Sequence, residues 1–314
     1  MVIGKLLASA ALVLSLLAPS RCPNTLALSF SSDGKQLATA GLGLPIKIWD
    51  VATGKELRRV SERSAWASPA LFTPDGKLIA HGAKSDRVER IPLDGRGEAE
   101  GLRITSAMTP WATLSRDGKI LAGPGRGSQD QEEVSIVDLD SLKKTHGLKT
   151  PATVWSCAFM PDGKTVLAAV DDRSLRGWDL ASGKECLKIT TPQSCFAIAV
   201  SPDGKTMAAG ADDGSVTLWD PQGKVLLTMK HDGFILGVAF SPDGKKLASA
   251  SFNGSTKVWD VSSGKLLHSM SGGYGSVTFS PDGRILAAGG TQDAPRVWLW
   301  DAESGKELRT LNAR

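Results

Sequence analysis

The chain has 314 residues, of which 41% are apolar and 22% charged, and its formal net charge is +4. This length and apolar content suffice for a large core within a single repeat domain. The positive charge is small and spread over lysines that follow Asp-Gly pairs, whereas nucleic-acid binding needs a concentrated basic face with stacking aromatics or a known motif. We therefore expect no nucleic-acid partner.

Residues 1–20 have the pattern of a secretory signal. Lys5 precedes an uncharged run, Leu6–Ala18, and small residues stand at Ala18 and Ser20, where a signal peptidase inspects the chain. The run is shorter than the roughly twenty residues of a membrane-spanning helix. We expect residues 1–20 to be removed on export to the periplasm or the exterior, with no stable membrane insertion afterwards.

Two other interpretations of this region stay open. Cys22 suggests a lipid anchor, but Arg21 and Pro19 stand where the lipid-attachment motif has a small and an aliphatic residue. Alternatively, the apolar run is not cleaved and packs as an extra outer strand.

Gly237–Lys265 is one complete unit of a pattern that recurs along the chain. It opens with an apolar alternation around Val238 and Phe240 that is typical of a half-buried strand. Ser241-Pro242-Asp243-Gly244 then has the residues of a type I turn, in which Pro presets φ and Gly takes the left-handed position. Further strands are predicted at Lys246–Ser251, Thr256–Trp259 and Leu266–Met270, so the unit is a four-stranded antiparallel meander.

The unit recurs seven times. Its Asp-Gly turn returns at intervals of 39 to 45 residues, and its third strand ends in Trp-Asp in five units, at Asp50, Asp179, Asp220, Asp260 and Asp301. A self-similar period of this length with four strands is the signature of a propeller, because each small sheet needs its neighbours to cover its faces. The sequence predicts an all-β fold, a seven-bladed β-propeller of four-stranded antiparallel blades over residues 21–314. The seven turn aspartates are Asp33, Asp75, Asp117, Asp162, Asp203, Asp243 and Asp282.

With its FSPDGK segments, Trp-Asp pairs and Ser-Gly-Lys turns, the chain resembles the WD-repeat β-propeller family over about residues 24–312, as an exported, bacterial-type member. The resemblance implies a non-catalytic platform that binds a protein or peptide partner. Family members also have a His before the first strand that joins an Asp, a Ser or Thr and the Trp in a hydrogen-bond network. Only the sixth unit has this His, His231, with Asn253 at the Asp position and Trp259 as the Trp.

Blades 2 and 3 depart from the pattern together. Blade 2 replaces the Trp-Asp strand with Arg87–Asp94, where Pro92 indicates an edge or distorted strand. Blade 3 has a polar, glycine-rich segment, Gly123–Glu133, that we interpret as a long loop. The pair is either a specialised sector or the product of drift in a tolerant fold.

The four cysteines match no zinc pattern. Cys157 and Cys195 fall in first strands of neighbouring blades, where a small buried residue is ordinary. A disulfide between these two is the alternative if the compartment is oxidising.

Candidate catalytic groups do not converge. The four histidines lie on different blades or at opposite ends of one, and no spacing indicates a nucleophile with its base or a metal site. The pairs Asp171-Asp172 and Asp212-Asp213 occupy equivalent loops and have the oxygens that a hard cation prefers, but Asp172 and Asp213 stand at the family's structural Asp position. We expect no catalytic residue, cofactor or metal. The alternative is an exported propeller enzyme of a lactonase-like or quinone-dependent kind.

The repeats start and stop in phase. Blade 1 begins at about Thr25 and has its own four strands, and Glu307–Leu311 completes blade 7. We therefore predict a seam between blades 1 and 7 with no exchanged strand, closed by packing alone.

The partner-binding surface is predicted on the face that carries the loops entering first strands and the loops joining second to third strands, because these vary from blade to blade. Aromatic residues gather there, and aromatic and Arg anchors dominate binding energy. Basic residues on blades 2 and 3 stand against acidic ones on blades 4 to 6, a contrast that could orient a polypeptide bound to a monomer. Trp155 and Phe196 are alternatively inter-blade core. The aromatic candidates are Trp66, Trp111, Trp155, Phe234 and Tyr274; the charged ones are Arg63, Lys84, Arg87 and Arg126 against Asp171, Asp172, Asp212, Asp213 and Asp232.

Overall fold

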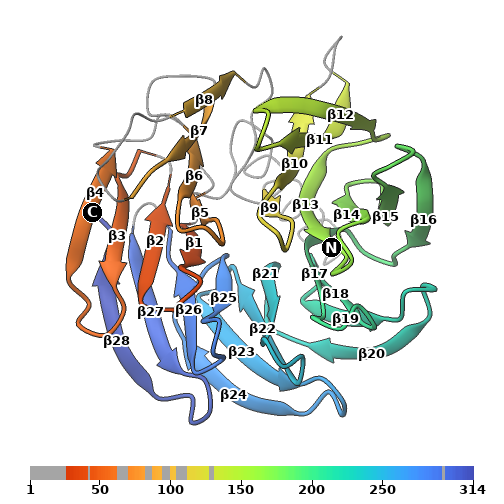
Figure 1. The fold of residues 1–314 in the computed structure, drawn as a ribbon. Coiled ribbons are helices and arrows are strands. Elements are labelled where there is room, and N and C mark those ends of the chain that lie inside the picture. Colours follow the sequence, from red (N-terminus) through yellow and green to blue (C-terminus); the bar gives the residue numbers. More distant parts are fainter. Residues whose placement is uncertain are drawn as a thin grey trace, which may run out of the picture.

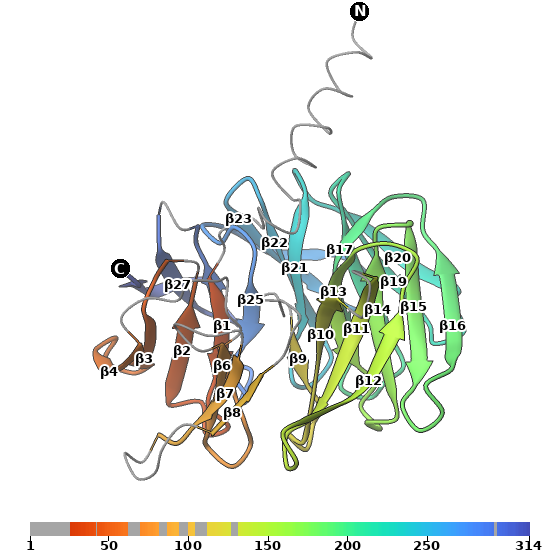
Figure 2. The ribbon, with the colours of Figure 1, turned by 90° about the horizontal axis from the view of Figure 1, so that it is seen from above.

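Seven four-stranded sheets stand around a common axis, and each is built from four consecutive strands (Figure 1). The computed structural model describes residues 26–41, 43–61, 70–81, 87–93, 100–103, 112–126, 131–291 and 294–314. Within every blade each strand pairs antiparallel with the next along the chain. Seen from the side, the strands run between the two faces of a thick disc (Figure 2). The predicted seven-bladed propeller is confirmed.

The blades follow the chain in order, and the first strand of each lies nearest the axis (Figure 1). Blade 1 has β1 (Ala27–Phe30), β2 (Gln36–Ala40), β3 (Ile46–Asp50) and β4 (Glu56–Ser61); blade 2 has β5 (Ala70–Phe72), β6 (Leu78–His81), β7 (Arg87–Ile91) and β8 (Glu100–Arg103); blade 3 has β9 (Thr113–Leu114), β10 (Ile120–Arg126), β11 (Glu132–Asp138) and β12 (Lys143–Lys149).

The other four blades are more regular in strand length. Blade 4 has β13 (Val154–Phe159), β14 (Thr165–Val170), β15 (Ser174–Asp179) and β16 (Glu185–Thr190); blade 5 has β17 (Cys195–Val200), β18 (Met207–Ala211), β19 (Ser215–Trp219) and β20 (Val225–Lys230); blade 6 has β21 (Ile235–Phe240), β22 (Lys246–Ser251), β23 (Ser255–Asp260) and β24 (Leu266–Ser271); blade 7 has β25 (Val277–Phe279), β26 (Ile285–Gly289), β27 (Arg296–Asp301) and β28 (Glu307–Asn312).

The Asp-Gly turns join first and second strands through one repeated set of hydrogen bonds. In blade 6 the Gly244 N–H donates to the Ser241 carbonyl at 2.8 Å, and Gly244 has a φ of 71°. Asp243 Oδ1 accepts from the Ser241 hydroxyl at 2.6 Å and from the Lys245 N–H at 3.0 Å. These donors favour the carboxylate, so they lower the pKa of Asp243.

The turns between third and fourth strands lie on the same face as the Asp-Gly turns, because alternate turns of a meander share one end of the sheet. We call this the turn face, and the opposite one, with the second-to-third turns and the inter-blade connections, the loop face. In blade 6, Asp260 Oδ1 accepts from the hydroxyls of Ser262 and Ser263 at 2.6 Å each and from the Ser263 N–H at 2.8 Å. These bonds lower the pKa of Asp260 to about 2.

The core lies between neighbouring blades, where apolar residues of both sheets share a cluster. Trp259 in β23 is 5% exposed and packs with residues of blade 5 such as Leu218. Its indole N–H donates to the buried Ser249 hydroxyl at 2.9 Å. Blade 1 repeats this bond from Trp49 to Thr39, also at 2.9 Å. The tryptophans therefore fill the joint and hold the second and third strands together.

His231 lies in the connection before β21 and is buried beside Trp259, with ring centroids 6.4 Å apart. Its Nδ1 lies 3.2 Å from the Asp232 carbonyl, whereas its buried Nε2 has no hydrogen-bond partner among the described residues. Burial, with Lys257 nearby, lowers the pKa of His231.

Cys157 and Cys195 are buried and both are free thiols. They belong to different clusters of the inter-blade core. Burial raises the pKa of both thiols, that of Cys195 to about 12. The core interpretation is confirmed, and the two residues are not bonded to each other.

Among the described strands none is exchanged across the seam between blades 1 and 7, as predicted. It is not closed by packing alone. The Leu26 N–H donates to the Gly290 carbonyl at 3.1 Å, and the Leu26 carbonyl accepts from the Ser276 hydroxyl. Lys47 Nζ in β3 donates to the main-chain oxygen of Arg314. Backbone groups at the seam therefore find partners across it, since a buried amide without one is costly.

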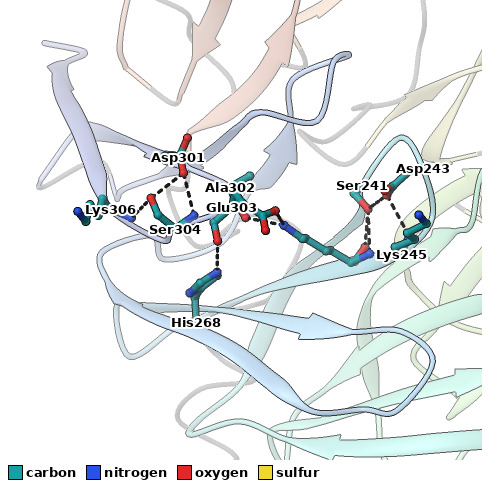
Figure 3. Close-up of polar contacts among 10 residues, drawn as sticks. Ser241, Asp243, Lys245, His268, Asp301, Ala302, Glu303, Ser304 and Lys306 are labelled. Carbon is teal, nitrogen blue, oxygen red and sulfur yellow. Dashed lines mark hydrogen bonds and ion pairs between the residues drawn. The ribbon is translucent and has the colours of Figure 1, made fainter.

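Polar contacts also join blades 6 and 7 on the turn face (Figure 3). Lys246 Nζ donates to the Ala302 carbonyl at 3.0 Å and pairs with Glu303 Oε2 at 2.5 Å. His268 Nε2 donates to the Glu303 carbonyl at 2.8 Å. The last turn of blade 7 thus rests on the second and fourth strands of blade 6.

The predicted long loop of blade 3 is wrong over most of its length. β10 continues through Gly123 to Arg126 and pairs with β11 as far as Glu132. On the side of β10 that faces β9, the described pairing is limited to Leu121 and Ala122. Pro124 therefore lies beyond that pairing, where the N–H that proline lacks is not needed for a hydrogen bond to β9. In blade 2, β7 ends at Ile91, directly before Pro92.

Candidate functional site

Three neighbouring inner strands are bulged at their second residue, at the end that meets the loop face. The pairing of β13, β17 and β21 with the following strand shifts at Trp155, Phe196 and Leu236. A bulge inserts one unpaired residue and aims its side chain differently from the strand's alternation. Because inner strands border the axis (Figure 1), the bulges bring three apolar side chains together at one place on the ring.

These three side chains form a separate buried cluster that joins blades 4, 5 and 6. Trp155 and Phe196 are therefore buried between blades, as the alternative interpretation had it. The rings of Trp155 and Phe196 meet edge to face, with centroids 5.0 Å apart at 83°. Phe234 packs against this cluster, and the centroid of its ring lies 6.5 Å from that of Phe252, which is 38% exposed. We call Trp155, Phe196, Phe234, Leu236 and Phe252 the mouth patch.

Two aspartates, Asp171 and Asp212, stand at the first position of the second-to-third turns of blades 4 and 5. Asp171 Oδ1 accepts from the Trp155 indole N–H at 3.0 Å, which fixes that ring. Asp212, one blade further, has a buried Oδ1 without a hydrogen-bond partner among the described residues. Burial and the neighbouring Asp213 raise the pKa of Asp212.

The other acidic candidates are engaged within the fold. Asp172 Oδ2 pairs with Arg176 at 2.6 Å, and Asp213 and Asp232 pair with lysines, Lys230 at 3.0 Å and Lys257 at 3.3 Å. Asp172 and Asp213 also accept from the hydroxyls two residues on, Ser174 and Ser215. These contacts support the structural role considered for Asp172 and Asp213, whereas Asp171 contacts the patch through Trp155.

The remaining candidates are distributed differently. Tyr274 is half-buried between blades 6 and 7, where its ring lies 6.2 Å from that of Trp298, so it is not part of the mouth patch. Arg87 begins β7, and its side chain is not among those described. The candidates outside the described residues are Arg63, Trp66, Lys84 and Trp111.

Sequence reasoning missed Phe252 and Leu236. Phe252 occupies the same turn position as Asp171 and Asp212. In each case the backbone N–H of this residue donates to the carbonyl of the residue directly before the first strand of the same blade. Aligning these turns would have revealed it, whereas no local signal marks Leu236 as a bulge residue.

No set of three or more His, Cys, Asp or Glu side chains among the described residues is placed to hold a metal ion. The same part of the chain has no helix with the length and apolar character to cross a bilayer.

Three segments, residues 141–179, 184–220 and 223–260, match the family model described as WD domain, G-beta repeat. The chain is 31% identical over 162 residues to WD repeat-containing protein SL1-17 of Schistosoma mansoni, and the match covers 51% of this chain and 52% of that protein. It is 31% identical over 166 residues to nuclear distribution protein PAC1 of Coccidioides posadasii, covering 47% and 35%. The chain thus spans about half the length of these relatives or less.

Among solved structures, the chain is similar to one titled Kuenenia stuttgartiensis Hydrazine Synthase, with a TM-score of 0.76. The match covers 89% of this chain and 96% of that chain at 22% identity. Similarity at this identity shows a common fold and nothing about activity.

Proposed function

Because the chain belongs to the WD-repeat β-propeller family, we propose that it is a non-catalytic interaction platform whose loop face binds a protein or peptide partner. Proteins of this family generally bind protein partners. The observation that carries the proposal is the mouth patch, in which bulges of three adjacent inner strands gather aromatic side chains.

The patch has the composition of a binding hot spot. Phe252 is exposed and Phe234 half-buried above a buried floor of Trp155, Phe196 and Leu236. Aromatic anchors of this kind contribute about 2 kcal/mol or more each to binding when they enter a partner's pocket. A partner segment that presents an apolar side chain to Phe234 and Phe252 fits this surface.

The test compares capture of partners by the mature protein and by the double variant Phe234→Ala with Phe252→Ala. We expect partners recovered from the native envelope fraction with wild-type protein to be lost with the double variant. Lys205→Ala on the turn face is the matched control, because Lys205 is exposed and far from the patch along its blade. Unchanged capture by a folded double variant would remove the loop face as the binding surface.

We also propose that the protein acts outside the cytoplasm, in the periplasm or the exterior. The support is Lys5, the apolar run Leu6–Ala18 and the small residues that follow. Mass spectrometry of the mature protein should find a terminus near residue 21. A terminus at Met1 or Leu6 would contradict export with cleavage.

The catalytic alternative has weaker support. The similarity to a hydrazine synthase concerns the fold alone, and one member of each acidic pair considered for a cation, Asp172 or Asp213, is hydrogen-bonded within its own turn.

A further inference from the structure

On the turn face, the Asp-Gly turns of neighbouring blades touch one another around the inner rim. At five of the seven joints, the proline ring of one turn packs against the turn glycine of the next blade. The proline Cδ lies 2.3–3.5 Å from the position that a Cβ on that glycine would take. We call these contacts the proline–glycine joints: Pro74 to Gly118, Pro161 to Gly204, Pro202 to Gly244, Pro242 to Gly283 and Pro281 to Gly34.

Two joints lack this contact. Blade 1 has Ser32 at the proline position and blade 3 has Arg116. The glycines that these turns would meet, Gly76 and Gly163, have no described atom within 4 Å of the Cβ position. Loss of the proline therefore leaves the surface of the next turn uncovered.

The open joint between blades 3 and 4 forms a hollow of about 350 Å³. Arg116 and Asp117 line it from blade 3, and Pro161, Asp162 and Gly163 line it from blade 4. Apolar surface comes from the Pro161 ring and from Ile120, and the Arg116 and Asp162 side chains are exposed. A volume of this size admits one residue of a chain together with its flanking peptide groups.

Two polar side chains of this hollow, Asp162 and Arg116, have few hydrogen-bond partners. Blade 4 has Met160 where five of the other turns have Ser and one has Thr, so Asp162 accepts from the Lys164 N–H at 2.9 Å but from no hydroxyl in the described residues. No hydrogen bond or ion pair joins the Arg116 side chain to another described residue. At the other open joint, by contrast, Asp75 bonds the Thr73 hydroxyl and pairs with Lys77 at 3.0 Å.

We propose that the hollow between blades 3 and 4 binds a proline residue in an extended segment of a partner polypeptide. The fold itself supplies the precedent, because the same glycine surface is covered by a pyrrolidine ring at five other joints. Arg116 donates to a peptide carbonyl beside the proline, and Asp162 accepts from a peptide N–H. A proline-containing segment is pre-organised as an extended helix whose peptide groups are free for such bonds. The site lies on the face opposite the mouth patch and does not depend on it.

The test uses the mature protein and two fluorescein-labelled peptides of about ten residues, one alternating Ala and Pro and the other alternating Ala and Ser. Fluorescence polarisation should show at least about fivefold tighter binding of the proline peptide. Arg116→Pro should weaken that binding by about tenfold or more, because its own ring closes the joint. Arg116→Ala keeps the hollow and should weaken it by about three- to tenfold, through loss of the donor.

Ser32→Pro is the matched control, because it closes the other open joint and leaves the hollow intact. It should change peptide affinity by less than about twofold. Both proline variants should raise the Tm by about 1–2 °C, since proline suits the second position of this turn. Equal binding of the two peptides, no binding of either, undiminished binding by Arg116→Pro, or an equal loss with Ser32→Pro would each overturn the site. None of these outcomes bears on the Phe234 and Phe252 test of the loop face.

Discussion

The two open joints on the turn face divide the inner rim into a run of five blades, from blade 4 through blade 7 to blade 1, and a separate pair, blades 2 and 3. The same pair lacks the Trp-Asp ending of the third strand. The turn proline itself is missing in blades 1 and 3, at Ser32 and Arg116, so blade 3 is the blade that lacks both the proline and the Trp-Asp ending. The turn prolines and the strand tryptophans both pack at the joints between blades, so blade 3, which has neither, must rely on other contacts.

Blades 6 and 3 show this difference on one face of the third strand. In blade 6 that face carries Lys257 and Trp259, and Lys257 Nζ lies 5.8 Å from the ring centroid. In blade 3 it carries Glu133, Ser135 and Val137, since alternate residues of a strand share a face. Glu133 is 4% exposed, accepts from the Ser135 hydroxyl at 2.5 Å and pairs with Lys144 of β12. Blade 3 therefore joins its third and fourth strands by an ion pair whose carboxylate is buried and whose lysine is exposed.

The largest effect is expected where the repeat is regular. Trp259→Ala removes a buried ring and its bond to Ser249 and should lower the free energy of unfolding by about 3–5 kcal/mol. Val137→Ala, at the equivalent position of blade 3, should cost only about 1–2 kcal/mol, at roughly 0.8 kcal/mol per buried methylene. Urea unfolding of the two variants measures both, and similar losses would contradict the proposed difference between the blades.

The turn glycines test the joints directly. Gly118 and Gly163 both have positive φ, 72° and 68°, so an Ala at either is strained by about 1–2 kcal/mol. At Gly118 the new Cβ would also lie 2.3 Å from Pro74 Cδ, which should add about 1–3 kcal/mol of overpacking. Thermal unfolding should give Gly118→Ala a clearly lower Tm than Gly163→Ala. The reverse order would mean that the proline ring does not pack closely against the glycine at these joints.

The buried Glu133 carboxylate lies against Gly147, which pairs with Ser135 in the ladder. A Cβ on Gly147 would lie 2.2 Å from Glu133 Oε2, so Gly147→Ala should cost about 1–3 kcal/mol by displacing the carboxylate. The equivalent residue of blade 6 is the exposed Ser269, and Ser269→Ala should stay within about 0.5 kcal/mol. A Gly147→Ala protein as stable as wild type would show that the ion pair is dispensable.

The smallest effect concerns pH and belongs to blade 6. Burial and Lys257 lower the pKa of His231 below its ordinary value of 6.5, so the unfolded chain takes up this proton before the folded one. Stability should therefore fall as pH drops through about 6.5 towards 5, and His231→Gln should flatten that part of the profile. Urea unfolding midpoints at pH 7 and pH 5 measure this change in stability. An equal change in wild type and in His231→Gln would mean that other groups cause the pH dependence.

The sequence predicted the blades well because turn chemistry is local. The Asp-Gly turn needs a glycine in the left-handed conformation, so each copy can be recognised from four consecutive residues. The strand predicted after one of these turns, Lys246–Ser251, coincides with β22. The mouth patch was harder. Trp155 shares strand parity with Phe159, which packs against the inter-blade core, and only the bulge beside Val154 breaks that parity. A bulge depends on the approach of neighbouring blades, so alternation along one strand does not reveal it.

The seam has a consequence for how the chain folds. Every sheet pairs only strands that follow one another, so the sheets form from contacts close in sequence, which favours rapid formation. The contact from Ser276 to Leu26 instead joins residues 250 apart, and the entropy of closing that long loop is lost only when blade 7 meets blade 1. We expect ring closure to be the last and slowest step of folding, after the blades have formed one by one.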